Sequence, residues 1–156
     1  MSDATSDAMS ETVRKFPAKP DNVCFGCGGA NAVGMKLEFE ANTKTGRVTG
    51  RFKIAKDFQG SMGMLHGGII ALLMDEAMGK VCRLSEVRAV TAELAVKYLR
   101  PIQVEQQIVV EAFQVKREGR DMYHESTISD ANGKVLARGA GRFVVINPAD
   151  FTKRDS

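Results

Sequence analysis

The stretch GSMGMLHGGIIALLMDEAMGKVCRL, residues 60–84, decides the fold of this chain. Apolar residues run from Ile69 to Leu84 without a proline, and the β-branched ones are confined to the first turn and Val81. This spacing predicts a helix of about four turns. Because the run is too apolar to lie half exposed, we expect it to be a central helix that the rest of the chain buries.

Two adjacent carboxylates interrupt this helix. Glu76 has a simple role, because Lys80 lies four residues further along and forms a favourable ion pair on the same helix face. Asp75 has no basic residue three or four positions away. A lone carboxylate on an apolar face is costly unless a group from elsewhere in the fold pairs with it. Asp75 is therefore a candidate catalytic residue, the alternative being a structural hydrogen bond to a buried donor.

The start of the helix is the second candidate feature. Gly67 and Gly68 lie where the first turn leaves its N–H groups unpaired, and without side chains they allow a ligand oxygen to approach. Such donors form an oxyanion hole for acyl chemistry. The simpler alternative is that two glycines permit a tight turn from the loop into the helix.

These residues resemble a known family. His66, Gly67 and Gly68, followed nine positions after the histidine by Asp75, look like the signature of hotdog-fold acyl-CoA thioesterases of the PaaI type, in the 4-hydroxybenzoyl-CoA thioesterase-like superfamily. The resemblance covers residues 24–146 and includes CFGCG at 24–28 and AVTAELAVKYLRP at 89–101. It implies hydrolysis of an acyl-CoA thioester, and it says little about the acyl group.

The resemblance also implies roles for single residues. Asp75 would act as general base on water or as nucleophile. Gly67 would donate its N–H to the thioester oxygen, with Gly68 as a weaker second donor. His66 would orient the loop or contact the carbonyl, and a purely structural role is an equal alternative. Thr91 would hold the water or orient the carboxylate, unless it is simply a good strand residue.

One position departs from the family pattern. Several relatives carry Asn or Gln six residues before the histidine, where the amide helps to bind the carbonyl or the water. Here that position is Gly60, and Gln59 precedes it. Gln59 would take this substrate-binding role only if the loop shifts by one residue.

The rest of the chain alternates between apolar and polar residues, which is typical of strands. We expect two strands before the helix and four after it, with a turn at residues 130–133. The expected ranges are 35–41, 48–54, 90–98, 108–116, 122–128 and 135–146. One antiparallel sheet of about six strands wrapped around one long helix is an α+β arrangement, and the hotdog fold is of this kind.

Composition places the chain among ordinary single-domain proteins. It has 156 residues, 44% of them hydrophobic, and a net charge of +3, which is too small to indicate a nucleic-acid partner. No apolar run approaches the roughly 18 residues that a membrane-spanning helix needs. We expect a disordered N-terminal arm at residues 1–19, a hotdog thioesterase domain at 20–147 and a polar tail at 148–156. Without an apolar signal segment, the default location is the cytoplasm.

Cys24 and Cys27 form a CxxC pair, which is half of a tetrahedral zinc site, and no second half follows in the sequence. We therefore expect no metal, and no cofactor apart from coenzyme A as part of the substrate and product. His124 shares a strand face with apolar residues, so it is expected in the core or at an interface. Five basic residues could contact the phosphates of coenzyme A, although most of them fit an ordinary solvated face better: Lys97, Arg100, Lys116, Arg117 and Arg120.

The sequence therefore predicts an acyl-CoA thioesterase. Two alternatives remain: a hotdog enoyl-thioester hydratase or dehydratase, and a module that binds acyl-CoA without turnover. A hotdog sheet has exposed edges, and related enzymes pair two sheets with the active site between subunits. We expect a homodimer or homotetramer.

Overall fold

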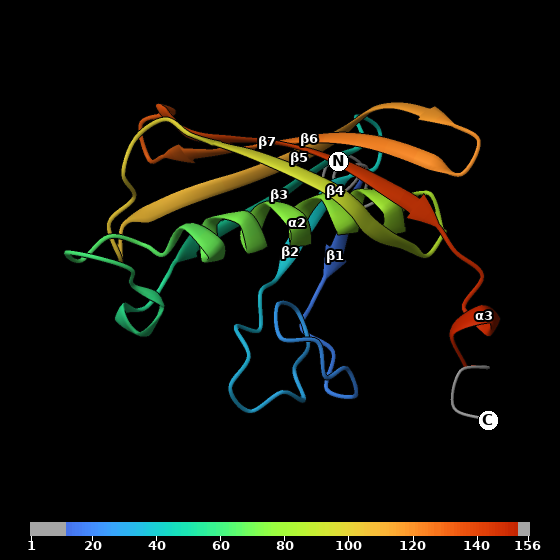
Figure 1. The fold of residues 1–156 in the computed structure, drawn as a ribbon, viewed down its shortest axis with the longest axis horizontal. Coiled ribbons are helices and arrows are strands. Elements are labelled where there is room, and N and C mark those ends of the chain that lie inside the picture. Colours follow the sequence, from blue (N-terminus) through green and yellow to red (C-terminus); the bar gives the residue numbers. More distant parts are fainter. Residues whose placement is uncertain (1–11, 153–156) are drawn as a thin grey trace, which may run out of the picture.

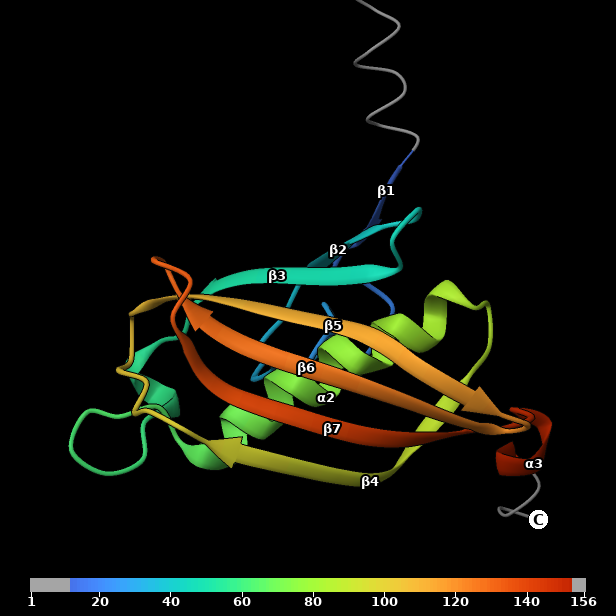
Figure 2. The same ribbon diagram turned by 90° about the horizontal axis from the view of Figure 1, so that it is seen from above.

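The computed structural model describes residues 12–152, which form one antiparallel sheet around one long helix (Figure 1). The seven strands lie in the order β1-β2-β3-β5-β6-β7-β4, as the view in Figure 2 shows. The elements are β1 (Val13–Phe16), β2 (Phe39–Asn42), β3 (Arg47–Lys53), the 3-10 helix η1 (Lys56–Phe58), α2 (Gly67–Leu84), β4 (Ala89–Tyr98), β5 (Gln107–Glu118), β6 (Asp121–Asp130), β7 (Val135–Val145) and α3 (Ala149–Thr152).

Helix α2 packs one face against the inner side of this sheet. The buried residues recur at helical spacing: Ile70, Leu73, Met74, Ala77, Met78, Val81 and Cys82. They meet apolar side chains from β3, β5, β6 and β7, including Val48, Ile108, Ile128 and Phe143. Burying one large apolar side chain contributes about 1.5–3 kcal/mol, so this face holds the helix to the sheet. The predicted hotdog fold is confirmed.

The opposite face of α2 differs from the prediction of a helix buried on all sides. Ala71, Leu72, Asp75, Glu76 and Gly79 are only half-buried in the single chain. An 18-residue helix lying across one sheet has only one face in contact with it, and the other face must find a different cover. This half-open face carries Asp75.

The N-terminal segment predicted as a disordered arm, residues 1–19, is partly ordered in the residues that the structure describes. Val13–Phe16 forms strand β1 and pairs with β2, which makes seven strands instead of about six. Backbone hydrogen bonds to a distant strand hold this polar segment in place, and local composition does not reveal them. Residues 1–11 of the predicted arm and 153–156 of the predicted tail lie outside the described residues.

The first predicted strand is shorter than expected. The alternation from Met35 suggests an extended chain, but Lys36 has φ of 51°, in the left-handed region. An L-residue with that backbone interrupts the pleat, so β2 begins only at Phe39. The predicted turn after β6 is confirmed: the Asp130 carboxylate accepts hydrogen bonds from the N–H groups of Asn132 and Lys134, and Gly133 has φ of 84°.

Within residues 12–152, no helix is both long enough and apolar enough to cross a membrane.

Candidate functional site

Asp75 lies next to Thr91 across the gap between α2 and β4. The Thr91 hydroxyl donates a hydrogen bond of 2.6 Å to Oδ1 of Asp75. Both side chains line a cleft of about 460 Å³ on the half-open face of the helix. The expected partner from elsewhere in the fold is therefore the strand hydroxyl that the sequence singled out. The hydroxyl orients one carboxylate oxygen and leaves the other, Oδ2, available for chemistry.

At the start of the helix, the backbone N–H groups of the two glycines differ in whether they already have a hydrogen-bond acceptor. His66 is the N-cap residue, and its Nδ1 accepts a hydrogen bond of 2.9 Å from the N–H of Gly68. The Gly68 donor is thus already used, and a side chain there would lie only 3.1 Å from that imidazole nitrogen. The Gly67 N–H has no acceptor in the part of the chain that the structure describes. Of the two predicted oxyanion donors, Gly67 is the available one.

Tyr98 is a site residue that the sequence did not single out. Its hydroxyl donates a hydrogen bond of 2.8 Å to the carbonyl of Gly67, from the far end of β4. This bond ties the Gly67–Gly68 peptide, in the first turn of α2, to the sheet and so restrains the backbone directly after the Gly67 N–H. A tyrosine at the end of a strand is common, so the sequence carries no signal for this role.

The two halves of the predicted site do not meet within one chain. Gly67 and Asp75 are eight residues apart, which at 1.5 Å per residue places them about 12 Å apart along the axis. Gln59, His66 and Gly68 line a separate shallow pocket that contains neither Asp75 nor Thr91. Gln59 therefore lies on the glycine side of the site, beside His66. Gly60 packs closely against the same histidine, since a Cβ at this glycine would lie 3.3 Å from Cα of His66.

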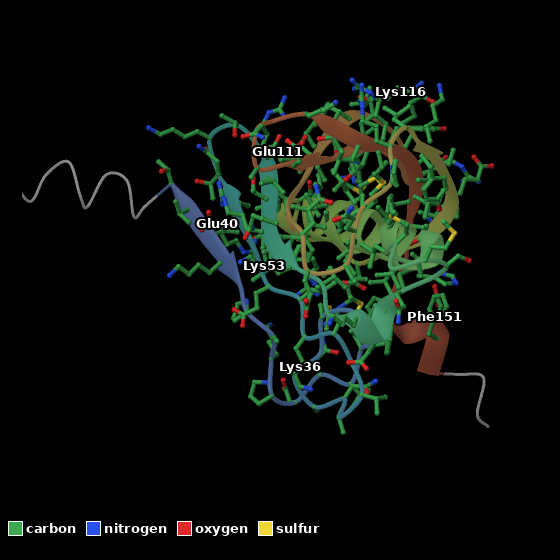
Figure 3. The ribbon with its side chains drawn as sticks, turned by 90° about the vertical axis from the view of Figure 1, so that its left-hand side faces the viewer. Lys36, Glu40, Lys53, Glu111, Lys116 and Phe151 are labelled. Atoms are coloured by element: carbon green, nitrogen blue, oxygen red, sulfur yellow. The ribbon has the colours of Figure 1, made fainter. Side chains whose placement is uncertain are left out.

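The cleft beside Asp75 is strongly basic. Six cationic side chains line this cleft: Arg14, Lys15, Lys19, Lys80, Arg83 and Arg88. They come from β1, the loop after it, α2 and the segment before β4. None of them was among the candidates for phosphate contact. Of those candidates, Lys116 lies on the opposite side of the molecule from Lys36 (Figure 3), where it pairs with Glu118 at 3.1 Å. Arg100, Arg117 and Arg120 are bonded to backbone carbonyls, at Val135, Gly119 and Val145.

The CFGCG loop lines the same cleft. Burial raises the pKa of the Cys27 thiol to about 11, so it is protonated at neutral pH. Cys24 Sγ lies 3.6 Å from Oε1 of Glu76, and Lys80 pairs with the other oxygen of that carboxylate at 3.8 Å. The predicted ion pair between Glu76 and Lys80 is confirmed, and the two cysteines join it from a distant part of the chain.

His124 lies in the core, as one of the two predicted alternatives has it. Only 1% of its surface is exposed, and Nε2 lies 3.2 Å from Sγ of the buried Cys82. Burial lowers the pKa of His124 to about 4 and raises that of Cys82 to about 12. Both groups are therefore neutral at pH 7 and belong to the packing of α2 against β6.

Comparisons with known proteins give the family and the fold that this chain resembles. Residues 62–137 match the family model described as Thioesterase superfamily. The chain is 31% identical over 117 residues to acyl-coenzyme A thioesterase THEM4 of Mus musculus, covering 74% of this chain and 50% of the mouse protein. It thus spans about half the length of that relative.

Two solved structures share the fold. A thioesterase superfamily protein, RHA08564, superimposes with a TM-score of 0.72 at 27% identity, covering 78% of this chain and 62% of the other. The E. coli PaaI protein from the phenylacetic acid degradation operon superimposes with a TM-score of 0.60 at 17% identity, covering 63% and 75%. At that identity the PaaI protein supports the fold alone, and it confirms the predicted PaaI-like architecture.

Proposed function

We propose that the protein hydrolyses an acyl-CoA thioester to a free acid and coenzyme A. The match of residues 62–137 to the family model described as Thioesterase superfamily supports this proposal. The observation that carries the proposal is the carboxylate of Asp75, held by Thr91 at 2.6 Å on the wall of an open, basic cleft. A carboxylate fixed in this way on a helix face is suited to act on a water molecule or on the thioester carbon.

The chemistry needs one base or nucleophile and one donor for the oxyanion. Asp75 takes a proton from water as that water attacks the thioester carbonyl, or it attacks the carbonyl itself to form an anhydride that water then cleaves. In either route negative charge develops on the carbonyl oxygen. The N–H of Gly67, at the positive end of the α2 dipole, stabilises that charge. The thiolate of coenzyme A leaves and takes up a proton.

A complete site requires two chains in this proposal. Within one chain, Gly67 and Asp75 are about 12 Å apart along the helix. Strand β4 ends the sheet order, and its outer edge has no strand partner among residues 12–152. Val90 and Tyr98 on this strand are 40% and 55% exposed. Pairing of two such edges in a homodimer would cover them and bring Gly67 of one subunit opposite Asp75 of the other.

The proposal is tested by thiol release from short, medium, long and aromatic acyl-CoAs, measured for wild type and Asp75→Asn. We expect turnover that falls at least about a hundredfold in the variant, as for loss of a general base. Glu93→Gln is the matched control, because it removes a carboxylate from β4, two residues from Thr91, that is paired with Arg142 at 3.3 Å. If wild type releases no thiol from any member of the panel but binds acyl-CoA, hydrolysis is refuted, and the binding-module and enoyl-thioester hydratase alternatives replace it.

A second experiment tests the two-chain site. Gly67→Pro removes the proposed N–H donor and little else, because proline is well tolerated at the first helical position. The preceding residue, His66, has φ −59° and ψ 134°, which is the backbone conformation that a residue before proline adopts. Each variant alone should be inactive. In a mixed dimer with Asp75→Asn, one of the two shared sites is intact, so random mixing restores about a quarter of wild-type activity. A site contained in one chain would give no recovery.

A further inference from the structure

The CFGCG loop is built closely against helix α2. A Cβ at Gly26 would lie within 2.7 Å of three side-chain atoms of Glu76, so a larger residue there would displace this carboxylate. A Cβ at Gly28 would overlap the carbonyl oxygen of Asn22 and the N–H nitrogen of Cys24. Because the contacts at Gly28 are with backbone atoms, no side chain fits at that position. The two glycines therefore let the loop fold back on itself and press both cysteines toward the helix.

Three metal-ligand atoms meet at this contact. Sγ of Cys24, Sγ of Cys27 and a carboxylate oxygen of Glu76 all lie within 4.8 Å of one another. Cys24 Sγ and Glu76 Oε1 are 3.6 Å apart. In a tetrahedral zinc site with Zn–S of about 2.3 Å and Zn–O of about 2.0–2.2 Å, neighbouring ligand atoms are separated by about 3.5–3.8 Å. The observed cluster needs only small side-chain rotations to reach that spacing.

We propose that Cys24, Cys27 and Glu76 bind one Zn²⁺ ion, whose fourth position opens into the basic cleft and is filled by water. Two thiolates with one carboxylate and an open position suit zinc, whereas magnesium and calcium require oxygen ligands. This departs from the expectation that no metal binds. That expectation counted ligands along the sequence, where Glu76 follows Cys27 by 49 residues.

Lys80 balances the charge of this site. Zn²⁺ displaces the protons of both thiols to solvent as it binds, so Cys27, protonated in the metal-free chain, becomes a thiolate ligand. Two thiolates, one carboxylate and Zn²⁺ carry a net charge of −1, and the Lys80 ammonium lies 3.8 Å from Oε2 of Glu76. The positive charge of Lys80 also acts to lower the pKa of Cys27, against the larger effect of burial. Lys80 thus donates to the ligands rather than competing with them for the ion. The bound ion would fix the loop to the helix one residue away from Asp75.

The test is titration of the reduced full chain with Co²⁺ alone, followed by Zn²⁺. We expect a thiolate-to-cobalt charge-transfer band and the visible bands of tetrahedral cobalt, at about one ion per chain, all lost when zinc displaces cobalt. Cys24→Ser and Cys27→Ser should abolish the charge-transfer band or reduce it strongly. Lys80→Gln should weaken binding about tenfold while retaining the spectrum.

Asp75→Asn separates this proposal from the catalytic one. It should lose thioester hydrolysis and keep cobalt binding unchanged, because its carboxylate is not a ligand. Reduced wild-type protein that takes up no cobalt would overturn the zinc site, whether or not the two thiols can be oxidised to a disulfide. A full cobalt spectrum in both cysteine variants would overturn it as well.

Discussion

In the proposed mechanism, the hydrogen bond from Thr91 to Asp75 makes activity depend on a single hydroxyl. Thr91→Val removes Oγ1 and keeps the β-branched shape, at an exposed position of β4. A hydrogen bond of 2.6 Å to a carboxylate is short and charge-assisted, and such bonds contribute about 1.5–3 kcal/mol. Since about 1.4 kcal/mol corresponds to a factor of ten, kcat/KM should fall about ten- to a hundredfold.

The assay is thiol release at several substrate concentrations for wild type, Thr91→Val, Thr91→Ser, Asp75→Asn and the double variant. Thr91→Ser keeps the hydroxyl and should stay within about threefold of wild type. In the Asp75→Asn background, Thr91→Val should add less than about threefold, because the group it positions is gone. The free energy of unfolding should fall by about 0.5–1.5 kcal/mol, less than the full value of the bond, because Thr91 is exposed and water replaces the lost partner of Asp75.

Two results would refute this account. One is a Thr91→Val enzyme with wild-type kcat/KM. The other is a loss of the same factor with and without the Asp75 carboxylate, which would show that Thr91 acts on the substrate or the fold independently.

Contacts elsewhere in the fold give three further predictions. Burial lowers the pKa of His124 from 6.5 to about 4, so the unfolded chain takes up a proton before the folded chain does as the pH falls. The free energy of unfolding should therefore drop by about 3 kcal/mol between pH 6.5 and 4. Urea unfolding at several pH values should show this drop in wild type and a smaller one in His124→Gln. Tyr98→Phe removes the 2.8 Å hydrogen bond to the Gly67 carbonyl, worth about 0.5–1.5 kcal/mol, and so loosens the first turn of α2 next to the Gly67 N–H. We expect kcat to fall several-fold with little change in Tm, and an unchanged kcat would mean that this restraint does not help to position the donor. Gly139→Ala places a Cβ 2.7 Å from Sδ of the fully buried Met74. We expect this overpacking to lower the free energy of unfolding, measured with urea, by about 1–3 kcal/mol. Wild-type stability in this variant would show that the methionine moves aside freely.

Local periodicity was sufficient for most of the fold. The apolar run of residues 69–84 predicts α2, because its apolar residues recur about once per helical turn and it contains no proline. The alternation after the helix predicts β4 to β7 within a few residues of their observed ends. It failed at Lys36, where a left-handed backbone ends the extended pattern, and at β1, whose pairing with β2 depends on residues more than twenty positions away.

The candidate site divides in the same way. Asp75 was identifiable because no basic residue within one helical turn accounts for its charge, and Gly67 because it begins the helix. The structure then chose between alternatives that the sequence left equal. Thr91 points at the carboxylate, His66 caps the helix, and the cap uses the N–H of Gly68.

By itself, the sequence determined which segments are helical or extended and which groups are chemically unusual, because these properties depend on neighbours within a few residues. Only the tertiary structure decided which of those groups meet. The contact of Cys24 and Cys27 with Glu76 joins a loop to a helix about fifty residues later, and the separation of Gly67 from Asp75 follows from the rigid length of α2. Such distances are set by how the whole sheet closes around the helix, and no local pattern of residues encodes them.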